Sequence, residues 1–494
     1  MSNDTFCSDL PTRANPEIGK ILVTAPTGYV GGRLVPELLA RGYSVRVMVR
    51  SASLEYQQRW PAAEVVTADM FQPENLKTCM EGVHTAYYLR QSFTLQNLKD
   101  DIFADIHIAS IFRKAAEEKG IKRIIYFEAL SNIISAKTDP MRSRLEIARE
   151  LGKGNVSITV LLADIIIGSG SASYEFIKNL VRKVPVLIIP KWATNKCRPI
   201  AIRDVIKYLV GVLEVTETSG KTFEISGKDI LAYEMMLRIM AEIFGKKRLF
   251  IPFPFSLIGF LAYVGSLLTP VPASINRQNL TAIRDLVFRP VDDINDFLSI
   301  QTLSYKEAVV RAMSREEQDE IHTRWTDSHP AGHELALKLG ELEEPPRFSR
   351  TYVLITEKDP FSLFDSVTRV GGKEGWLYST WMWQVRGVVD RMLLGVGTSR
   401  GRRSTSSLRI NDVVDFWRVE DMIRDKMLLL RAEMRLPGKA WLQFTIEPKD
   451  DKYSLAVTPY FHTKNLFGKM YWYVFLPFHH SIFINLLKEI AKRS

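Results

Sequence analysis

Apolar residues change their spacing several times along the first third of the chain, and each change predicts a switch between strand and helix. A short, continuous apolar run is typical of a parallel strand covered on both faces. Leu34 and Leu38 recur at helical spacing, and Gly42 follows where a helix C-cap glycine is expected. The pattern therefore predicts a strand over 21–24, a glycine-containing turn over 25–31, a helix over 32–41 and a strand over 43–49.

The same alternation continues beyond this first unit. It predicts further strands over 64–67, 83–89, 123–127 and 157–162, with helices over 73–80 and 101–119. Repeated strand–helix units joined by right-handed crossovers give a doubly wound parallel sheet. The expected fold class is α/β of the Rossmann type.

The turn after the first strand has the composition of a pyrophosphate site. Backbone N–H groups at the start of a helix, together with the positive end of the helix dipole, attract an anion. Gly28 would let phosphates approach the backbone, and Gly31 would let the helix pack closely on the strand. We expect the turn to bind a dinucleotide through Thr27, Gly28, Tyr29, Val30 and Gly31.

The residue that selects the ribose should follow the second strand. A carboxylate there would favour NAD, but the chain has Arg50, with Arg46 and Arg33 nearby in sequence. A guanidinium suits a 2′-phosphate through charge-assisted hydrogen bonds. The sequence therefore predicts NADP, with NAD as the second choice; the alternative is a solvated arginine in an ordinary βαβ unit.

The segment TAPTGYVGGRLVPELLARGYSVRVMVR resembles the TGATGYIG opening of the atypical short-chain dehydrogenase/reductases, a group that includes the NmrA-like proteins. It departs from that pattern at Ala25, where the family has its first glycine, and at Pro26. Alanine resists the positive φ that glycine allows, and proline removes one N–H from the turn. Both changes are expected to weaken cofactor binding without removing the fold.

The resemblance implies further site residues. Asp69 is expected near the adenine, and Leu89 ends the strand beside the nicotinamide path. Short-chain dehydrogenases use a Tyr-x-x-x-Lys pair in which the tyrosine is the general acid and the lysine lowers its pKa. The helix after the fifth strand lacks this pair. The remaining polar candidates for a catalytic role are Tyr88, Gln91, Ser92, Ser131 and Arg144; Tyr126 is expected in the core.

Residues 168–313 resemble the substrate-side half of the same family. Within them, residues 249–272 are strongly apolar but interrupted by prolines, which leaves too short a run to span a bilayer. We expect a buried or surface-docking helical cap here, with peripheral membrane contact through 249–272 as an alternative. Together, the sequence predicts a Rossmann domain with its cap over 19–315.

After a charged linker over 316–348, residues 349–494 change character. The pattern predicts strands over 352–356, 376–383, 411–419, 427–434, 440–448 and 453–461, and a final helix over 477–492. This order suggests an α+β helix-grip (START-like) domain with an apolar ligand cavity. Segments such as LRINDVVDFWRVE and GKMYWYVFLPFHHSIF resemble a domain of unknown function that bacteria fuse to NmrA-like reductases. Its dense aromatics should mostly form core. Arg400, Arg402 and Arg403 are expected in a solvated loop or in contact with an anion or a lipid headgroup.

Composition narrows the remaining choices. The chain has 494 residues, 46% of them hydrophobic and 25% charged, which is typical of globular proteins. Its net charge of +10 is spread along the sequence, so we expect no nucleic-acid partner. Three cysteines without metal or redox spacing indicate a reducing compartment. Residues 1–18 are polar and read as a disordered arm rather than a signal peptide, so we expect a cytoplasmic protein, with membrane contact at most peripheral. HPAGHE in the linker is not a zinc motif, and no metal is expected.

Two hypotheses for function remain. The first is an NADP-dependent oxidoreductase that acts on an apolar substrate held by the C-terminal domain. The second is a protein that senses NADP(H), or assists assembly of a complex, without catalysis, as the resemblance to NmrA-like proteins implies. The absent Tyr-x-x-x-Lys pair favours the second, and the two-domain build favours the first. The sequence leaves open whether the protein is an enzyme.

Overall fold

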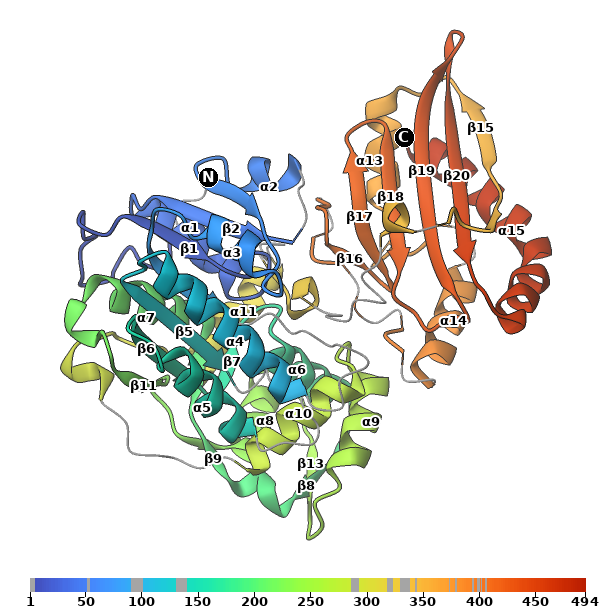
Figure 1. Cartoon of the computed structure of the whole chain (residues 1–494). Helices are drawn as coiled ribbons and strands as arrows, with labels where there is room; N and C mark the ends of the chain where they lie inside the picture. The colour runs from blue at the N-terminus through green and yellow to red at the C-terminus, as the bar shows by residue number, and fades with distance from the viewer. Residues whose placement is uncertain are drawn as a thin grey trace. The chain divides into compact units, whose positions relative to one another are not determined.

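The chain divides into two compact units, one formed by Met1–Leu268 with Ala273–Gly332 and the other by Thr269–Pro272 with His333–Ser494 (Figure 1). The computed structural model describes residues 5–50, 54–89, 101–129, 140–285, 293–317, 323–328, 338–342, 344–372, 374–377, 380–392, 395–397, 400, 402–404 and 407–494.

A seven-stranded sheet forms the centre of the first unit, and all its strand pairs are parallel. In spatial order its strands are β11 (Thr222–Ile225), β6 (Ser157–Ala163), β5 (Arg123–Ala129), β4 (Val83–Leu89), β1 (Lys20–Val23), β2 (Val45–Val49) and β3 (Glu64–Thr67). The chain order reverses between β1 and β4, and ligands of such sheets bind at this reversal. The predicted doubly wound parallel sheet is confirmed.

Helices cover both faces of this sheet, and each face has its own apolar core. One core includes Leu34 and Leu38 of α1 (Gly31–Ala40) and Val205 and Leu209 of α7 (Ile202–Glu214). The other includes side chains of α3 (Pro73–Cys79), α4 (Asp101–Glu118) and α5 (Pro140–Leu151), with α4 and α5 in front of the sheet in Figure 1. Burial on both faces explains why the strands are continuously apolar.

The rest of the first unit consists of short strand pairs and helices. The pairs are β7 (Ile165–Ile167) with β10 (Pro199–Ala201), β8 (Val186–Pro190) with β13 (Leu249–Phe253), and β9 (Lys196–Cys197) with β12 (Leu231–Ala232). The helices are α2 (Leu54–Arg59), α6 (Ala172–Lys183), α8 (Tyr233–Ile243), α9 (Ile258–Leu268), α10 (Ala273–Arg284) and α11 (Tyr305–Glu317). The apolar stretch 249–272 therefore forms a strand and a helix, rather than a purely helical cap. In the described part of the chain, no helix combines the length and the apolar character that crossing a bilayer requires.

The N-terminal segment packs onto α1, and the prediction of a disordered arm over 1–18 is wrong for residues 5–18. The backbone N–H groups of Phe6 and Cys7 donate to the Glu37 carboxylate at 2.7 and 3.1 Å. Phe6 and Leu10 are buried in the core on that face. The partners lie about thirty residues away in the sequence, so local composition did not reveal them.

Part of the predicted linker also belongs to the first unit. Thr323 is fully buried, and its hydroxyl donates to the carbonyl oxygen of Tyr29 at 2.8 Å. The backbone N–H of Trp325 donates to the carbonyl oxygen of Gly170 at 2.8 Å. The residues that follow Thr323 form a short 3-10 helix, Trp325–Ser328. Residues 323–328 are thus fixed to the turn at the start of α1, although the sequence predicts a solvated linker.

The second unit is built on an antiparallel sheet. Its strands run β14 (Phe348–Ser349), β20 (Lys452–His462), β19 (Lys439–Lys449), β18 (Met427–Ala432), β17 (Trp417–Ile423) and β16 (Val413–Val414), with β15 (Tyr352–Thr356) also paired to β20. Short helix α13 (Pro360–Thr368) and the second half of α15 (Leu466–Arg493) contribute to its core. The antiparallel sheet with a long C-terminal helix is as predicted. The START-like assignment stays a prediction.

Two elements of this unit differ from the sequence prediction. The prediction of a strand over 376–383 is wrong, because α14 (Thr380–Met392) begins within that range. The final helix begins at Leu466 rather than at residue 477, because the Asn465 side chain caps it by accepting from the N–H of Gly468 at 2.7 Å. Pro477, which resembles a first-turn proline, lies inside the helix.

The basic cluster at 400–403 is not solvated, and neither interpretation made from the sequence holds. Arg400 is 3% exposed and pairs with the buried Glu433 carboxylate at 2.7 Å. Arg403 pairs with Asp412 at 2.9 Å, and Arg402 donates to the carbonyl oxygen of Val370 at 3.2 Å. Arg400 and Arg403 are therefore buried in the second unit, and Arg402 is partly exposed.

Candidate functional site

The turn between β1 and α1 lies at the carboxyl edge of the parallel sheet, beside the reversal of strand order. Gly28 closes the turn by donating its N–H to the carbonyl oxygen of Ala25 at 3.0 Å. Helix α1 begins at Gly31, and no side chain caps its first turn. The N–H groups of Gly32 and Arg33 already donate to the carbonyl oxygens of Gly28 and Val30 at 3.0 Å. An anion at this helix start would therefore be attracted mainly by the positive end of the helix dipole.

Ala25 has the backbone conformation that the family pattern assigns to glycine. Its φ is 49°, in the left-handed region, which costs a non-glycine residue about 1–2 kcal/mol. Gly31 has no room for a side chain, because an added Cβ would overlap the carbonyl oxygen of Ala25. The turn keeps its tight form although its first glycine is replaced.

A second contact joins this turn to the neighbouring strand. The hydroxyl of Thr24 lies 3.0 Å from the carbonyl oxygen of Leu89 and accepts from the Leu89 N–H at 2.9 Å. Thr24 is fully buried, so these bonds fix the ends of β1 and β4 against each other. Leu89 therefore lies at the reversal point, next to the turn.

The other two predicted binding residues follow neighbouring strands. Arg50 comes directly after β2 and is exposed to solvent. Asp69 comes after β3, and its carboxylate accepts from the N–H of Phe71 at 3.0 Å, which closes a local turn. The carboxyl ends of parallel strands meet at one edge, so Arg50, Asp69 and Leu89 lie along the same edge as the turn.

Comparison with known families finds one matching segment in each of the two units. Residues 17–149 match the NmrA-like family, and residues 348–486 match a family described as a protein of unknown function, DUF2867. The first unit thus contains a segment similar to the NmrA-like family, and the second contains one similar to DUF2867. We use these names for the first and the second compact unit.

Curated relatives and solved structures resemble the NmrA-like domain. The Photosystem II assembly factor Ycf39 of Synechocystis sp. is 22% identical over 253 residues, which are 49% of this chain and 73% of that protein. Ycf39 of Guillardia theta is 25% identical, over 49% of this chain and 76% of that protein. Among solved structures, the Citrobacter sp. triphenylmethane reductase complexed with NADP(H) has a TM-score of 0.46 and 20% identity, over 59% of this chain and 99% of that one. A nucleoside-diphosphate-sugar epimerase from Staphylococcus aureus has a TM-score of 0.45 and 16% identity, over 59% and 99%.

Two arginines that the sequence suggested near a cofactor phosphate serve the NmrA-like domain itself. Arg33 is buried and donates to the carbonyl oxygens of Tyr29, Thr323 and Ser169 at 3.0–3.1 Å. Arg46 is also buried and donates to two carbonyl oxygens of the segment 79–81 at 2.7 Å, and it pairs with Glu64 at 2.9 Å. A contact with the 2′-phosphate therefore stays a hypothesis for Arg50 alone among these three arginines.

The side chain of Tyr29 points into the domain rather than toward a ligand. Its ring lies under the Arg33 guanidinium, 4.3 Å from centroid to Cζ. Burial raises the pKa of its phenol. Gly168 faces the Tyr29 hydroxyl closely enough that an added Cβ would lie 2.8 Å from it. Any contact of Tyr29 with a dinucleotide in this geometry would come from its backbone.

Of the catalytic candidates, the described part of the structure includes only the side chain of Tyr88. Tyr88 is a core residue: it is 4% exposed, and its ring packs edge-on against Phe112 at 4.8 Å and Tyr126 at 5.8 Å. This packing favours a structural role for Tyr88, and its catalytic role stays a prediction. Gln91, Ser92 and Ser131 lie outside the described residues. Arg144 lies on α5, and its side chain is likewise outside the described part.

Sequence reasoning missed one buried carboxylate at the same edge. Glu128 is fully buried in β5 and accepts a hydrogen bond from the Tyr126 hydroxyl at 3.1 Å. It is the residue before the last of that strand. Burying a carboxylate is costly, so buried carboxylates at such an edge are candidates for function. The signal was visible as a single acidic residue in the otherwise apolar run RIIYFEA.

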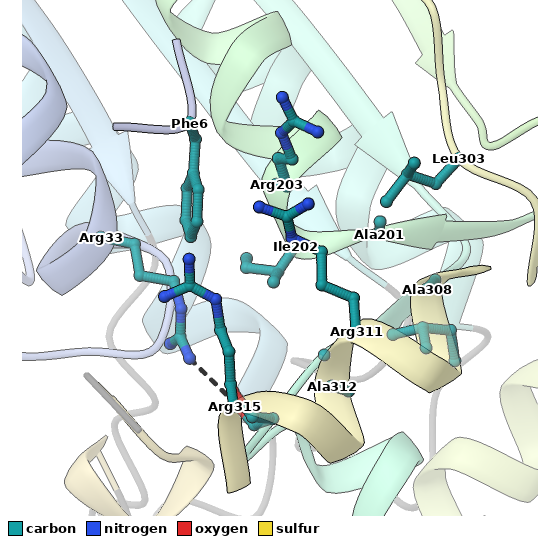
Figure 2. A pocket seen from close by; sticks show the side chains of 13 residues that line it. Phe6, Arg33, Ala201, Ile202, Arg203, Leu303, Ala308, Arg311, Ala312 and Arg315 are labelled. Carbon is teal, nitrogen blue, oxygen red and sulfur yellow. Dashed lines mark hydrogen bonds between the residues drawn. The ribbon is translucent and has the colours of Figure 1, made fainter. Parts of the chain in front are cut away.

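A pocket opens on the α1 and α7 face of the NmrA-like domain (Figure 2). Its lining residues include four arginines and no acidic side chain: Arg33, Arg203, Arg311 and Arg315. The N-terminal segment contributes Phe6, whose ring lies 5.4 Å from the Arg315 guanidinium. Just outside, the Asp9 carboxylate pairs with Arg203 at 2.8 Å and with Lys207 at 2.7 Å. The N-terminal segment thus supplies an acidic partner beside this basic wall.

Proposed function

We propose that the NmrA-like domain binds NADP(H) at the β1–α1 turn. The observation that carries this proposal is the left-handed Ala25: the chain accepts a strained residue to keep the tight turn beside an uncapped helix start. Such strain persists where function requires the conformation. The expected contacts are the backbone of Thr27 to Gly31 with the pyrophosphate, Arg50 with the 2′-phosphate, Asp69 with the adenine, and Leu89 beside the nicotinamide.

We further propose that the protein is an NADP-dependent oxidoreductase acting on an apolar substrate. The support is the family match together with the presence of a second domain. Glu128 joins Tyr88 as a described polar group to test at the nicotinamide end. Glu128→Gln, with Glu64→Gln at the opposite edge of the sheet as control, should lower turnover and leave NADPH binding unchanged.

The alternative is a protein that binds NADP(H) as a sensor or assembly factor without turnover. Two observations favour it: the helix after β5 lacks the Tyr-x-x-x-Lys pair, and Tyr88 is packed in the core. The name of the relatives, a Photosystem II assembly factor, points in the same direction.

One experiment separates the two candidates. Full-length protein is titrated with NADPH and NADH, and NADPH oxidation is followed with a panel of quinones and enones. Binding with turnover supports the reductase, and binding without turnover across the panel supports the sensor. Failure to bind either dinucleotide would contradict both.

Two ligand sites remain part of this proposal. The DUF2867 domain is proposed to hold the apolar substrate between its sheet and α15, which binding of a fluorescent fatty acid would test.

Residues 249–272 are proposed to touch a membrane surface, because Leu249, Phe255 and Phe260 are 59%, 66% and 54% exposed. Three basic residues, Lys246, Lys247 and Arg248, precede this segment.

A further inference from the structure

The first half of α15 carries apolar residues on both its inner and its outer side. Its inner side follows Gly468 and Trp472 toward the buried Phe483 and Leu487. Its outer side carries Leu466, Phe467, Met470, Tyr473, Val474 and Phe478, which are 71%, 76%, 55%, 63%, 60% and 52% exposed. A helix that is apolar on opposite sides is normally covered by protein or by lipid.

Helix α14 also carries exposed apolar side chains along one face. Trp381, Val385, Val388 and Met392 recur at i, i+4, i+7 and i+11, the spacing of a helix face that packs on a core. These side chains are 66%, 54%, 51% and 62% exposed. The stripe therefore faces outward, although its residue types and spacing suit burial.

The β18–β19 connection holds both helices at one end of the sheet (Figure 1). Arg386 of α14 donates to the carbonyl oxygen of Arg435 at 2.9 Å. Thr463, just before α15, donates to the carbonyl oxygen of Pro437 at 2.8 Å. We call the outward side chains of α14 and of residues 466–478 the apolar end of the DUF2867 domain.

Charges around the apolar end have one sign. Lys464 and Lys469 are exposed beside the outer side of α15, and Arg435 is exposed on the connection. The sequence has no aspartate or glutamate between Asp451 and Glu489. The one acidic residue of α14, Asp390, is fully buried and accepts from the N–H groups of Gly397 and Arg435 at 2.8 and 2.7 Å.

We propose that the apolar end binds the surface of an anionic lipid bilayer. Exposed Trp, Tyr and Phe bordered by Lys and Arg is the composition of helices that lie in a membrane interface. Lysine attracts anionic headgroups, and its alkyl stem lets the charge reach them while the apolar residues enter the acyl region. A second copy of the same surface would bring like charges together, which disfavours self-association as the occupant.

The test uses full-length protein and sedimentation with vesicles of phosphatidylcholine, either pure or mixed equally with phosphatidylglycerol. The double variant Phe467→Glu, Tyr473→Glu replaces two apolar side chains on the outer side of α15 by carboxylates. The double variant Lys464→Gln, Lys469→Gln removes two flanking charges. Phe361→Glu on α13, where the side chain is 57% exposed, is the matched control in the same domain. Phe260→Glu on α9 tests the separate contact proposed through 249–272. Thermal unfolding of each variant verifies that it is folded.

Binding to the phosphatidylglycerol vesicles is expected, with weaker binding in high salt. The phenylalanine–tyrosine variant should bind at least about tenfold more weakly, and each lost lysine should cost about fivefold. Phe361→Glu should bind as the wild type does. A blue shift of tryptophan emission on vesicle binding, absent in Trp381→Phe, would place α14 in the interface.

Several results would overturn the inference. One is no binding to either vesicle; another is equal loss in Phe361→Glu. Loss in Phe260→Glu alone would support contact through 249–272 and remove this role from the apolar end. A dimer that dissociates in the α15 variant, without vesicle binding, would identify a second copy as the occupant. None of these results bears on NADP(H) binding, which is measured separately.

Discussion

The carbonyl oxygen of Ala25 occupies the space that a side chain on Gly31 would need, so the two residues meet backbone to backbone where α1 begins. At this close approach Ala25 has a left-handed φ of 49°. Replacing the first family glycine by alanine therefore preserves the geometry at a cost in strain.

We expect Ala25→Gly to stabilise the NmrA-like domain by up to about 1 kcal/mol, because glycine adopts this φ without strain. Adding Pro26→Ala restores one N–H to the turn and should tighten NADPH binding. Thermal unfolding and dinucleotide titration measure the two effects. Gly31→Ala is the opposing control and should destabilise the domain. Equal or weaker NADPH binding in the double variant would contradict the prediction.

Arg50→Ala should reduce the preference for NADPH over NADH. Loss of one charge-assisted contact with the 2′-phosphate costs about 1.5–3 kcal/mol, or roughly tenfold or more in affinity. Dissociation constants for both dinucleotides give the ratio. Arg149→Ala, which removes an exposed arginine from α5, should leave the ratio as it is. If Arg50→Ala behaves in the same way, Arg50 is not the selector.

Glu433→Gln should destabilise the DUF2867 domain by about 3–5 kcal/mol, because it leaves two buried arginines without their carboxylate. Glu433 pairs with Arg400 at 2.7 Å and with Arg418 at 2.5 Å, and all three side chains are almost fully buried. Burial by itself would raise the pKa of Glu433, but Arg418 and Arg400 outweigh it and lower the pKa to about 2. Denaturant unfolding measures the loss. The exposed Glu447→Gln on β19 is the control and should change stability little.

Stability should also rise with pH between about 4 and 6.5 because of His479. Burial, together with the nearby Arg350, lowers the pKa of His479 to about 4. The unfolded chain, with an ordinary pKa of about 6.5, binds a proton in this range that the folded chain does not, so acid favours unfolding. His479→Gln should flatten the dependence of the unfolding midpoint on pH. The same change at the exposed neighbour, His480→Gln, should preserve it.

The domain boundary predicts different behaviour for two fragments. The N–H of Leu339 donates to the buried Glu420 carboxylate at 2.6 Å, so the DUF2867 domain uses contacts that precede residue 349. A fragment of 338–494 should therefore fold and be more stable than 349–494. Urea unfolding followed by circular dichroism compares them. If both fragments are unfolded, the domain does not fold independently of the rest of the chain.

Local pattern was enough for elements whose determinants are neighbours in sequence. The buried strands, the glycine turn and α1 follow from apolar spacing and from Gly28, Gly31 and Gly42. Residues 376–383 misled because aromatics at Trp376, Trp381 and Trp383 suit either element, and the longer helical spacing from Trp381 to Met392 decides between them. Pro477 misled because a proline suits the first turn of a helix, whereas Asn465 provides the actual cap.

Long-range partners account for the other errors. Arg33 contacts Thr323 from 290 positions away, and Arg400 meets Glu433, which lies just after β18. Nothing near these arginines in sequence distinguishes a buried donor from a solvated one. The positions of Arg50, Asp69 and Leu89 at one sheet edge, by contrast, follow from topology alone, because each comes at or just after the carboxyl end of a parallel strand.

The hydrogen bonds that Thr323 and Arg33 make to the carbonyl oxygen of Tyr29 also have a thermodynamic consequence. A molecule that moves this carbonyl on binding at the turn must change the free energy that holds residues 323–328 in place. By reciprocity, a change that displaces residues 323–328 alters the affinity of the turn for that molecule by the same factor by which the molecule alters their placement. The start of the connection between the two domains and the site at the start of α1 are therefore energetically coupled.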